Sequence, residues 1–432
     1  MPNPKHGDIV KIVTSEETVE GTLLPRPEIL DPNFIVLKLD NGYNIGIDKK
    51  KIKKTTVISP HKPRTEKKEK VKHNPKLPTV ALLSFGGTIS SKIDYKTGGV
   101  IADYDANDFL TMCPELKDIA NIEVKCLAKI MSEDMDYNDW AFMAKSIKKE
   151  LENDNISGVV VTQGTDTLHF STAAISFALQ DLNKPVIFTA SQRSIDRGSS
   201  DAFMNMSCSI IAAARFDGAV VATCMHGTTN DDYCILNRGT KVRKMHTSRR
   251  DAFRPINELP LAKVTTNGKI EVINKNYPKR NDSTPILKDK FEHKIGLLQI
   301  HPVIDPGLIE YFIKNKYKGI ILNATALGHV PTLHKTNSLI PVIEKAIKAG
   351  ILVVITTQTL YGRTHPYVYT NLRKLSVELG CVFAEDMLSE TAFIKVGWAI
   401  GNSKDIKEAK ELFSTNIAGE INERITADTF LY

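Results

Sequence analysis

Two short stretches of the sequence place hydroxyl and carboxyl side chains directly after glycine. Residues 84–90 read S-F-G-G-T-I-S and residues 162–167 read T-Q-G-T-D-T, which makes Thr88, Thr165 and Asp166 the candidate reactive groups. A hydroxyl can attack a carbonyl carbon, and the backbone N–H groups of a glycine-rich turn can hold the resulting oxyanion. The pattern therefore predicts acyl transfer. Because a threonine hydroxyl is a weak nucleophile without help, the reaction also needs a base.

The candidate bases lie in a basic run at residues 238–254, R-G-T-K-V-R-K-M-H-T-S-R-R-D-A-F-R. Asp166 is itself too weak a base when ionised beside water, but it could orient a lysine whose pKa is lowered by burial. The spacing alone leaves Lys241 and Lys244 as equal candidates. The residues by themselves favour a plainer alternative, in which the run is a solvated or phosphate-contacting basic surface.

Each reactive stretch follows an uninterrupted apolar run, at residues 80–83 and 159–161, which is typical of a buried parallel strand. In an open α/β sheet, ligands bind in the loops beyond the carboxyl ends of the strands, so we expect both stretches to open into one crevice. Gly86, Gly87 and Gly164 allow positive φ and let backbone N–H groups approach a bound molecule closely.

The chain beyond residue 78 alternates between strand and helix patterns. Strands are expected at Thr79–Ser84, Gly158–Thr162, Pro185–Ala190, Gly218–Thr223, Ile295–Ile300, Gly319–Asn323 and Ile351–Thr356. A helix is expected from Asp136 to Glu152, where apolar residues recur at helical spacing behind an aspartate cap. This order predicts an α/β fold with a mostly parallel sheet covered on both faces. The polar stretch 274–290 divides it into a larger domain at 79–275, which carries the reactive residues, and a smaller domain at 291–432.

The amino-terminal part has a different pattern. Residues 1–58 contain five short pieces of alternating apolar and polar residues, separated by turn signals that include Asp40-Asn41-Gly42. Five strands in so short a segment predict a small SH3-like or Sm-like β-barrel, of the kind that usually mediates interactions. Residues 59–78 contain four prolines and seven basic residues, with almost nothing apolar. This segment cannot bury enough surface to fold alone, so we interpret it as a basic, Pro-rich linker.

Length and composition limit the class of protein. The 432 residues suffice for two or three domains, and 42% hydrophobic with 25% charged residues is typical of a soluble globular protein. The sequence has no apolar run long enough to span a membrane and no signal-peptide core at its amino terminus. Its six cysteines form no C-x-x-C pair, and its histidines, including His169, His226 and His246, show no metal-ligand spacing. We therefore expect a cytoplasmic protein with reduced cysteines and no bound metal.

The net charge of +7 is concentrated in one part of the chain. Residues 1–80 carry sixteen Lys and Arg against ten Asp and Glu, whereas the remainder is nearly neutral. Such a surplus suits an anionic partner such as nucleic acid, although a solvated linker would give the same count.

The two reactive stretches also resemble a known pair of signatures. L-L-S-F-G-G-T-I-S-S at residues 82–91 and T-Q-G-T-D-T at residues 162–167 are similar to those of the bacterial-type L-asparaginase and glutaminase family. The resemblance continues through I-M-S-E-D-M at residues 130–135 and covers the chain from about Thr79 to the carboxyl terminus. It implies an asparaginase-like core of two α/β domains with a largely parallel sheet.

The resemblance also implies roles for individual residues. Catalytic roles fall on Thr88, Thr165, Asp166 and Lys244, with Lys244 preferred to Lys241; a lid and proton-relay role falls on Tyr95; and substrate binding falls on Ser132, Glu133, Gly87 and Gly164. Glu133 stands where many relatives have glutamine, and Gln163 replaces a more usual histidine. Which threonine attacks is left open, as is direct attack by water. Taken singly, a threonine in such a turn can serve only local backbone hydrogen bonds, and Asp166 could cap a helix.

The barrel, the linker and the basic run together resemble the D subunits of archaeal glutamyl-tRNA(Gln) amidotransferases. This resemblance implies that the chain hydrolyses glutamine and delivers ammonia to a partner, the E subunit of the same complex, which converts Glu-tRNA(Gln) to Gln-tRNA(Gln). ATP and Mg²⁺ would belong to that partner, since this chain has no G-x-x-x-x-G-K-[ST] loop and needs no cofactor of its own. A homodimer core within a heterotetramer is implied. The alternatives are a free-standing L-asparaginase or glutaminase and a nucleic-acid-binding protein without activity.

Overall fold

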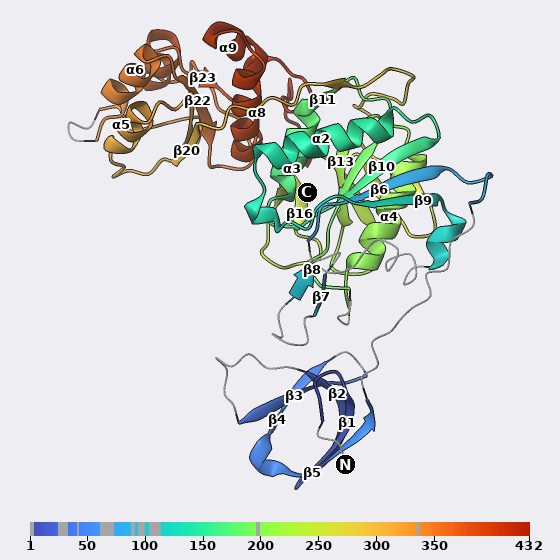
Figure 1. The fold of residues 1–432 in the computed structure, drawn as a ribbon. Coiled ribbons are helices and arrows are strands. Elements are labelled where there is room, and N and C mark those ends of the chain that lie inside the picture. Colours follow the sequence, from blue (N-terminus) through green and yellow to red (C-terminus); the bar gives the residue numbers. More distant parts are fainter. Residues whose placement is uncertain are drawn as a thin grey trace.

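The chain forms a small β-barrel and two α/β units, which are distinct in the ribbon of Figure 1. The structure is a computed structural model and describes residues 4–24, 33–40, 43–60, 73–87, 91–93, 100–102, 114–195, 199–333 and 337–432. Among these residues, no helix combines the length and the apolar character that crossing a membrane requires.

The barrel is a five-stranded antiparallel sheet in the order β4-β3-β2-β1-β5. Its strands are β1 (Ile9–Thr14), β2 (Thr18–Leu24), β3 (Phe34–Lys38), β4 (Asn44–Asp48) and β5 (Ile52–Ser59). Alternate residues point inward, as in Val10 and Ile12 of β1, and they meet Leu37 and Ile47 in the core. The small amino-terminal β domain expected from the sequence is confirmed.

The larger α/β unit is built on an eight-stranded sheet in the order β18-β17-β14-β13-β12-β10-β6-β9. The strands are β6 (Thr79–Ser84), β9 (Asn121–Cys126), β10 (Ile156–Thr162), β12 (Val186–Thr189), β13 (Val221–His226), β14 (Cys234–Arg238), β17 (Ala262–Val264) and β18 (Ile270–Val272). From β9 to β13 the strands run parallel, as predicted, but β14, β17 and β18 are antiparallel. The loop between β13 and β14 is too short for a crossover helix, which forces the chain to reverse direction.

Helices cover both faces of this sheet. They are α2 (Tyr137–Leu151), α3 (Leu168–Ala178) and α4 (Ala202–Arg215). In β6, Val80 and Leu82 enter one core while Ala81 and Leu83 enter the other, which explains why the strand is apolar throughout. The expected helix start at Asp136 is confirmed, because its carboxylate accepts hydrogen bonds from the first helical N–H groups in a capping box.

The smaller α/β unit has four parallel strands in the order β20-β21-β22-β23. Its elements are β20 (Ile295–Gln299), α5 (Gly307–Lys314), β21 (Gly319–Ala324), α6 (Ile340–Lys348), β22 (Leu352–Thr357), α7 (Thr370–Arg373), β23 (Val382–Phe383), α8 (Ser389–Gly401) and α9 (Ile406–Ser414). Helix α8 packs against α3 of the larger unit, where the rings of Phe177 and Trp398 stack 5.8 Å apart. The two units are therefore joined by a buried apolar interface.

Three short two-stranded sheets complete the structure. They pair β7 (Ser91–Ile93) with β8 (Val100–Ala102), β11 (Leu179–Gln180) with β19 (Ile286–Leu287), and β15 (Val242–Lys244) with β16 (Phe253–Pro255). The pair of β11 and β19 lies at the end of α3, on the connection that leads to the smaller unit.

Candidate active site

The two reactive stretches begin side by side. Strands β6 and β10 are parallel neighbours, with Ser84 paired to Thr162, so both chains leave the sheet at the same edge. Gly86 and Gly87 then adopt φ values of +103° and +86°, a region that L side chains rarely occupy. A Cβ atom on Gly87 would lie 2.3 Å from the carbonyl carbon of Gln163. The two turns are thus in direct backbone contact, as the parallel arrangement predicted. Thr88 and Tyr95 lie outside the described residues.

Thr165 and Asp166 follow β10 and precede α3. Thr165 is 8% exposed, and its hydroxyl lies 3.4 Å from Oδ1 of Asp166. Asp166 is not the cap of α3, because the cap residue is Thr167 and the helix has no side-chain cap hydrogen bond. The short polar turn between strand and helix therefore leaves both side chains available for contacts outside their own segment.

Lys244 makes those contacts. It ends β15, and its Nζ donates to Oγ1 of Thr165 at 2.8 Å and to Oδ1 of Asp166 at 2.7 Å. The lysine side chain is 10% exposed, whereas that of Asp166 is 64% exposed. The amine is therefore shielded from bulk solvent while it contacts the threonine, and it reaches the water-facing carboxylate. Lys244, Thr165 and Asp166 form the compact group expected from the sequence.

Lys241 occupies a different environment. Its Nζ lies 2.6 Å from Oδ2 of Asp386, and both side chains are completely buried. It has no contact with Thr165 among its hydrogen bonds, so the structure separates the two lysines that spacing alone could not. The basic run is not a uniformly solvated surface either, because Arg238 is also buried and paired with Glu258 at 3.0 Å.

Ser132 lies against the turn that carries Thr165. It begins a 3-10 helix (Ser132–Asp134) and is 3% exposed. A Cβ atom on Gly164 would lie 2.7 Å from its Oγ, and the hydroxyl of Thr167 donates to its carbonyl oxygen at 2.5 Å. Gly164 does not use the positive φ that glycine allows; glycine is needed there for space. Glu133 is exposed on the surface beside Ser132.

One residue near this group was treated as structural from the sequence alone. His169 lies in the first turn of α3, where burial lowers its pKa to about 4, and the positive charges of Arg243 and Lys244 act in the same direction. Its Nδ1 has no hydrogen-bond partner among the residues that the structure describes. Its place two residues after the cap of α3, close to Thr165 in the sequence, was the only signal available. The imidazole is therefore a neutral group beside the candidate site.

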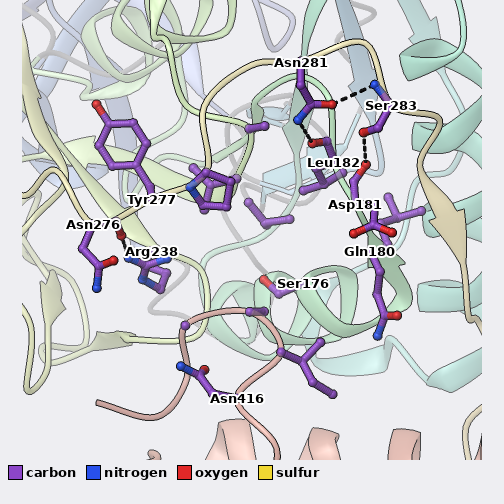
Figure 2. Close-up of a pocket in the computed structure, with 18 of the residues that line it drawn as sticks. Ser176, Gln180, Asp181, Leu182, Arg238, Asn276, Tyr277, Asn281, Ser283 and Asn416 are labelled. Atoms are coloured by element: carbon purple, nitrogen blue, oxygen red, sulfur yellow. Dashed lines mark hydrogen bonds between the residues drawn. The ribbon is translucent and has the colours of Figure 1, made fainter. Parts of the chain in front are cut away.

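A cavity of about 840 Å³ lies elsewhere, beside the amino end of strand β13 (Figure 2). It is lined by the start of β13, the end of α3, the chain from Lys275 to Pro278 and the carboxyl-terminal segment from Asn416 to Asn422. The charge of Arg238 in its wall is already matched by Glu258. Since Thr165 follows the carboxyl end of β10, this cavity is separate from the candidate active site.

The described residues offer no group of three or more His, Cys, Asp or Glu side chains that could hold a metal ion. The described groups of the candidate site are a hydroxyl, an amine and a carboxylate. Such a set can move a proton from the hydroxyl to the amine while the carboxylate stabilises the resulting ammonium.

Comparison with known proteins defines the class. Residues 79–278 match the family described as Asparaginase, N-terminal, and residues 294–413 match the Glutaminase/Asparaginase C-terminal domain. The thermostable L-asparaginase from Thermococcus kodakarensis superposes with a TM-score of 0.72 at 27% identity, covering 80% of this chain and 100% of that one. L-asparaginase I from Vibrio cholerae shares the fold, with a TM-score of 0.70 at 23% identity over 80% and 99% of the two chains. The core is thus that of an asparaginase-like protein.

The amino-terminal barrel narrows the assignment, since residues 5–58 match the GatD N-terminal domain. The chain is 45% identical over 431 residues to the D subunit of glutamyl-tRNA(Gln) amidotransferase from Thermococcus kodakarensis, covering 98% of this chain and 96% of that protein. The corresponding protein of Pyrococcus horikoshii is 44% identical over 431 residues, with coverage of 98% and 97%. The chain belongs to the family of glutamyl-tRNA(Gln) amidotransferase D subunits, and the resemblance inferred from the sequence is confirmed.

Proposed function

We propose that this chain is the glutaminase subunit of a tRNA-dependent amidotransferase. It hydrolyses the side-chain amide of glutamine and delivers the ammonia to a partner that converts Glu-tRNA(Gln) to Gln-tRNA(Gln). The observation that carries this proposal is the contact of the shielded Lys244 amine with Thr165 and Asp166, at 2.8 Å and 2.7 Å. Membership in the D-subunit family supports the choice of substrate and of partner.

The proposed reaction has two acyl-transfer steps. The hydroxyl of Thr88 attacks the amide carbon of glutamine, and Tyr95 or a water molecule relays its proton toward the leaving nitrogen. The C–N bond breaks, ammonia leaves, and an acyl-enzyme ester remains. Water then attacks this ester and releases glutamate, returning a proton to Thr88.

The group around Thr165 assists the second step. Lys244 is assigned the role of proton acceptor in this step: as water attacks, a proton passes to its amine through the Thr165 hydroxyl, which lies 2.8 Å away. The resulting ammonium is stabilised by Asp166 at 2.7 Å. This pair is partly open to solvent, so the contribution of Asp166 is screened and is smaller than that of the lysine.

Substrate binding is assigned to the surroundings of this group. Ser132 holds the α-carboxylate of glutamine and Glu133 its α-amino group, while the backbone at Gly87 and Gly164 lines the reacting amide. The close approach of Ser132 to Gly164 supports this assignment, because it brings the 3-10 helix against the reactive turn.

The partner completes the reaction. The E subunit binds the tRNA and uses ATP and Mg²⁺ to activate the glutamyl ester, so this chain requires no cofactor. Two copies of the chain form the core of a heterotetramer in the cytoplasm. The barrel and the basic linker, which lie outside the asparaginase-like core, serve contacts within this complex.

The test is an ammonia-release assay on the purified chain, with glutamine and with asparagine, each with and without the partner and glutamylated tRNA. We expect glutamine hydrolysis that is strongly stimulated by the partner and the tRNA. A high rate with asparagine for the chain alone would instead indicate a free-standing asparaginase. No hydrolysis under any condition would rule out the proposed glutaminase.

A further inference from the structure

The strand that carries Lys244 is held from two sides. Successive side chains of a strand point to opposite faces, so Val242 and Lys244 face the larger unit while Lys241 and Arg243 face the smaller one. Val242 packs into the core of the larger unit. On the other face, Nη2 of Arg243 lies 3.0 Å from Oε1 of Glu390, at the start of α8. The smaller unit thus contacts the residues that alternate with the proposed catalytic lysine.

The contact between Lys241 and Asp386 is the most buried of these. The amine and the carboxylate are 2.6 Å apart, and neither side chain has any exposed surface. The carboxylate is fixed in turn by Asn422, whose backbone N–H and Nδ2 donate to its two oxygens at 2.9 and 2.8 Å. Asp386 is therefore a fully hydrogen-bonded anchor and has little freedom to move with the lysine.

Asp386 and Thr391 of the smaller unit also contact the chain on both sides of the hairpin. Before β15, the hydroxyl of Thr391 donates to the carbonyl oxygen of Thr240 at 3.0 Å. After β16, Nδ2 of Asn257 donates to the carbonyl oxygen of Asp386 at 3.2 Å. Since β15 is only three residues long, these contacts at its base determine where its last residue, Lys244, is placed.

The energetics indicate that the buried pair of Lys241 and Asp386 fixes the position of the strand more than it adds to the stability of the protein. A buried ion pair contributes little more to stability than apolar side chains of the same size, but it has one preferred geometry. Position matters for the proposed base, because a shift of about 1 Å in a catalytic group can cost about 100-fold in rate. Apolar side chains in place of Lys241 and Asp386 would fill the same space but would not hold the strand in one position.

We propose that Asp386 and Lys241 are positioning residues for the glutaminase reaction: through this buried pair, together with the outer contact of Arg243 with Glu390, the smaller unit holds the amine of Lys244 against Thr165. The smaller unit thereby controls hydrolysis without contributing a side chain to the group of Thr165, Asp166 and Lys244. This inference rests on the proposed function for its kinetic consequences.

The kinetic test compares Asp386→Asn with a matched control, Glu150→Gln. Glu150 is also a buried carboxylate, 5% exposed and 2.7 Å from a lysine, Lys125, but it lies on α2 and contacts β9, away from the hairpin. Below the unfolding temperature of both variants, Asp386→Asn is expected to lower kcat for glutamine by about 10- to 100-fold, with KM changed less than about twofold. Glu150→Gln should lower the unfolding temperature and leave kcat unchanged. Equal effects of the two variants on kcat, or no effect of Asp386→Asn, would overturn the proposal.

Crystal structures of the wild type and of Asp386→Asn give a readout that does not need activity. We expect the distance from Nζ of Lys244 to Oγ1 of Thr165 to increase beyond hydrogen-bonding range in the variant. An unchanged distance would refute the positioning role even if the rate fell. If the wild type released no ammonia but the distance increased, the proposed function would fail and the positioning contact would stand.

A second variant covers the case in which Asp386→Asn does not fold. Glu390→Gln weakens the outer contact to Arg243, where the side chains are 10% and 31% exposed, and so should be tolerated better. We expect it to lower kcat by about threefold, consistent with a partly screened ion pair, and to leave KM unchanged. An unaltered kcat in this variant would then overturn the proposal.

Discussion

The amine of Lys244 lies 2.8 Å from the hydroxyl oxygen of Thr165, although 79 residues separate them in the chain. Each side chain is held by a different element: the threonine by the turn after β10, and the lysine by the hairpin of β15 and β16. Because the two supports are independent, either side chain can be altered without removing the support of the other. The proposed relay can therefore be tested one residue at a time.

Replacing Thr165 by valine should abolish steady-state ammonia release from glutamine, because the acyl-enzyme is then no longer hydrolysed. Valine keeps the shape of the side chain but has no hydroxyl to pass the proton, so we expect a fall in rate of at least about 1,000-fold. In the complex with the partner, amidation of Glu-tRNA(Gln) supplied with free ammonia should be intact. Both activities are measured on the same preparation.

Thr356→Val is a matched control for this experiment. Thr356 is also buried, with 0% of its surface exposed against 8% for Thr165; it lies in β22 of the smaller unit, and its hydroxyl bonds to groups of the neighbouring strand β21. It should retain glutamine hydrolysis. Loss of both the glutamine-dependent and the ammonia-dependent activity in Thr165→Val would instead show that Thr165 has a structural role.

Replacing Lys244 by methionine removes the proposed base while keeping a side chain of similar length. General-base catalysis contributes about 100- to 10,000-fold, so we expect kcat to fall by an amount in this range. Lys263→Met, on β17, is the control, since its amine lies over the ring of Tyr233 and has no contact with Thr165. Retention of more than half of the wild-type kcat in Lys244→Met would exclude the lysine as the base.

The elements that carry these residues could be predicted because their signals are local. The apolar runs that became β6 and β10 are buried on both faces, and parallel strands with such runs end at the same edge of a sheet. The start of α2 could be predicted equally well, because its cap and the spacing of Trp140, Met143 and Ile147 lie within one segment of the sequence. The placement of Thr165 and Asp166 in a common turn follows from such patterns.

The choice between the two lysines could not be made from such patterns. Lys241 and Lys244 lie three residues apart, one directly before strand β15 and one at its end, and what distinguishes them is the partner of each. Lys241 is paired with a carboxylate 145 residues further along the chain, and no periodicity in the sequence reports a contact of that range. The resemblance to a family selected Lys244, and the structure supplies the physical reason.

The antiparallel edge of the large sheet was missed for a related reason. Strands β14, β17 and β18 are short, and β14 consists of buried apolar and polar residues together, so its direction leaves no mark in the sequence. Gly164 shows at a single residue that the sequence does not report contacts between distant segments. Glycine in a turn allows positive φ, but here it makes room for Ser132, which belongs to a different segment.

Gly164→Ala tests whether that room matters for substrate binding. The added methyl group would lie 2.7 Å from Oγ and 2.9 Å from Cβ of Ser132, so the serine must move. Overpacking of this kind costs about 1–3 kcal/mol, and we expect KM for glutamine to rise by about tenfold or more. Gly46→Ala in the barrel is the control, because its nearest contact would be at 3.7 Å. A rise in KM in neither variant would argue against Ser132 as a substrate ligand.

His169 should make the stability of the protein depend on pH. Burial lowers its pKa from 6.5 to about 4 in the folded state, with Arg243 and Lys244 adding to the effect and Glu390 opposing it. As the pH falls below 6.5, the unfolded chain takes up a proton that the folded chain does not. The free energy of unfolding therefore decreases until the pH reaches about 4, by about 3 kcal/mol in total.

His169→Gln removes this contribution, so urea unfolding of the variant should depend less steeply on pH than that of the wild type between pH 6.5 and 4. Above pH 6.5 the imidazole is neutral in the folded protein and increasingly neutral in the unfolded chain, so the two curves should approach a constant separation there. The constant difference in the free energy of unfolding reports the packing lost with the imidazole ring. Only the difference in pH dependence reports the titration of His169. Parallel curves across the whole range would show that the imidazole of His169 is protonated as easily in the folded protein as in the unfolded chain.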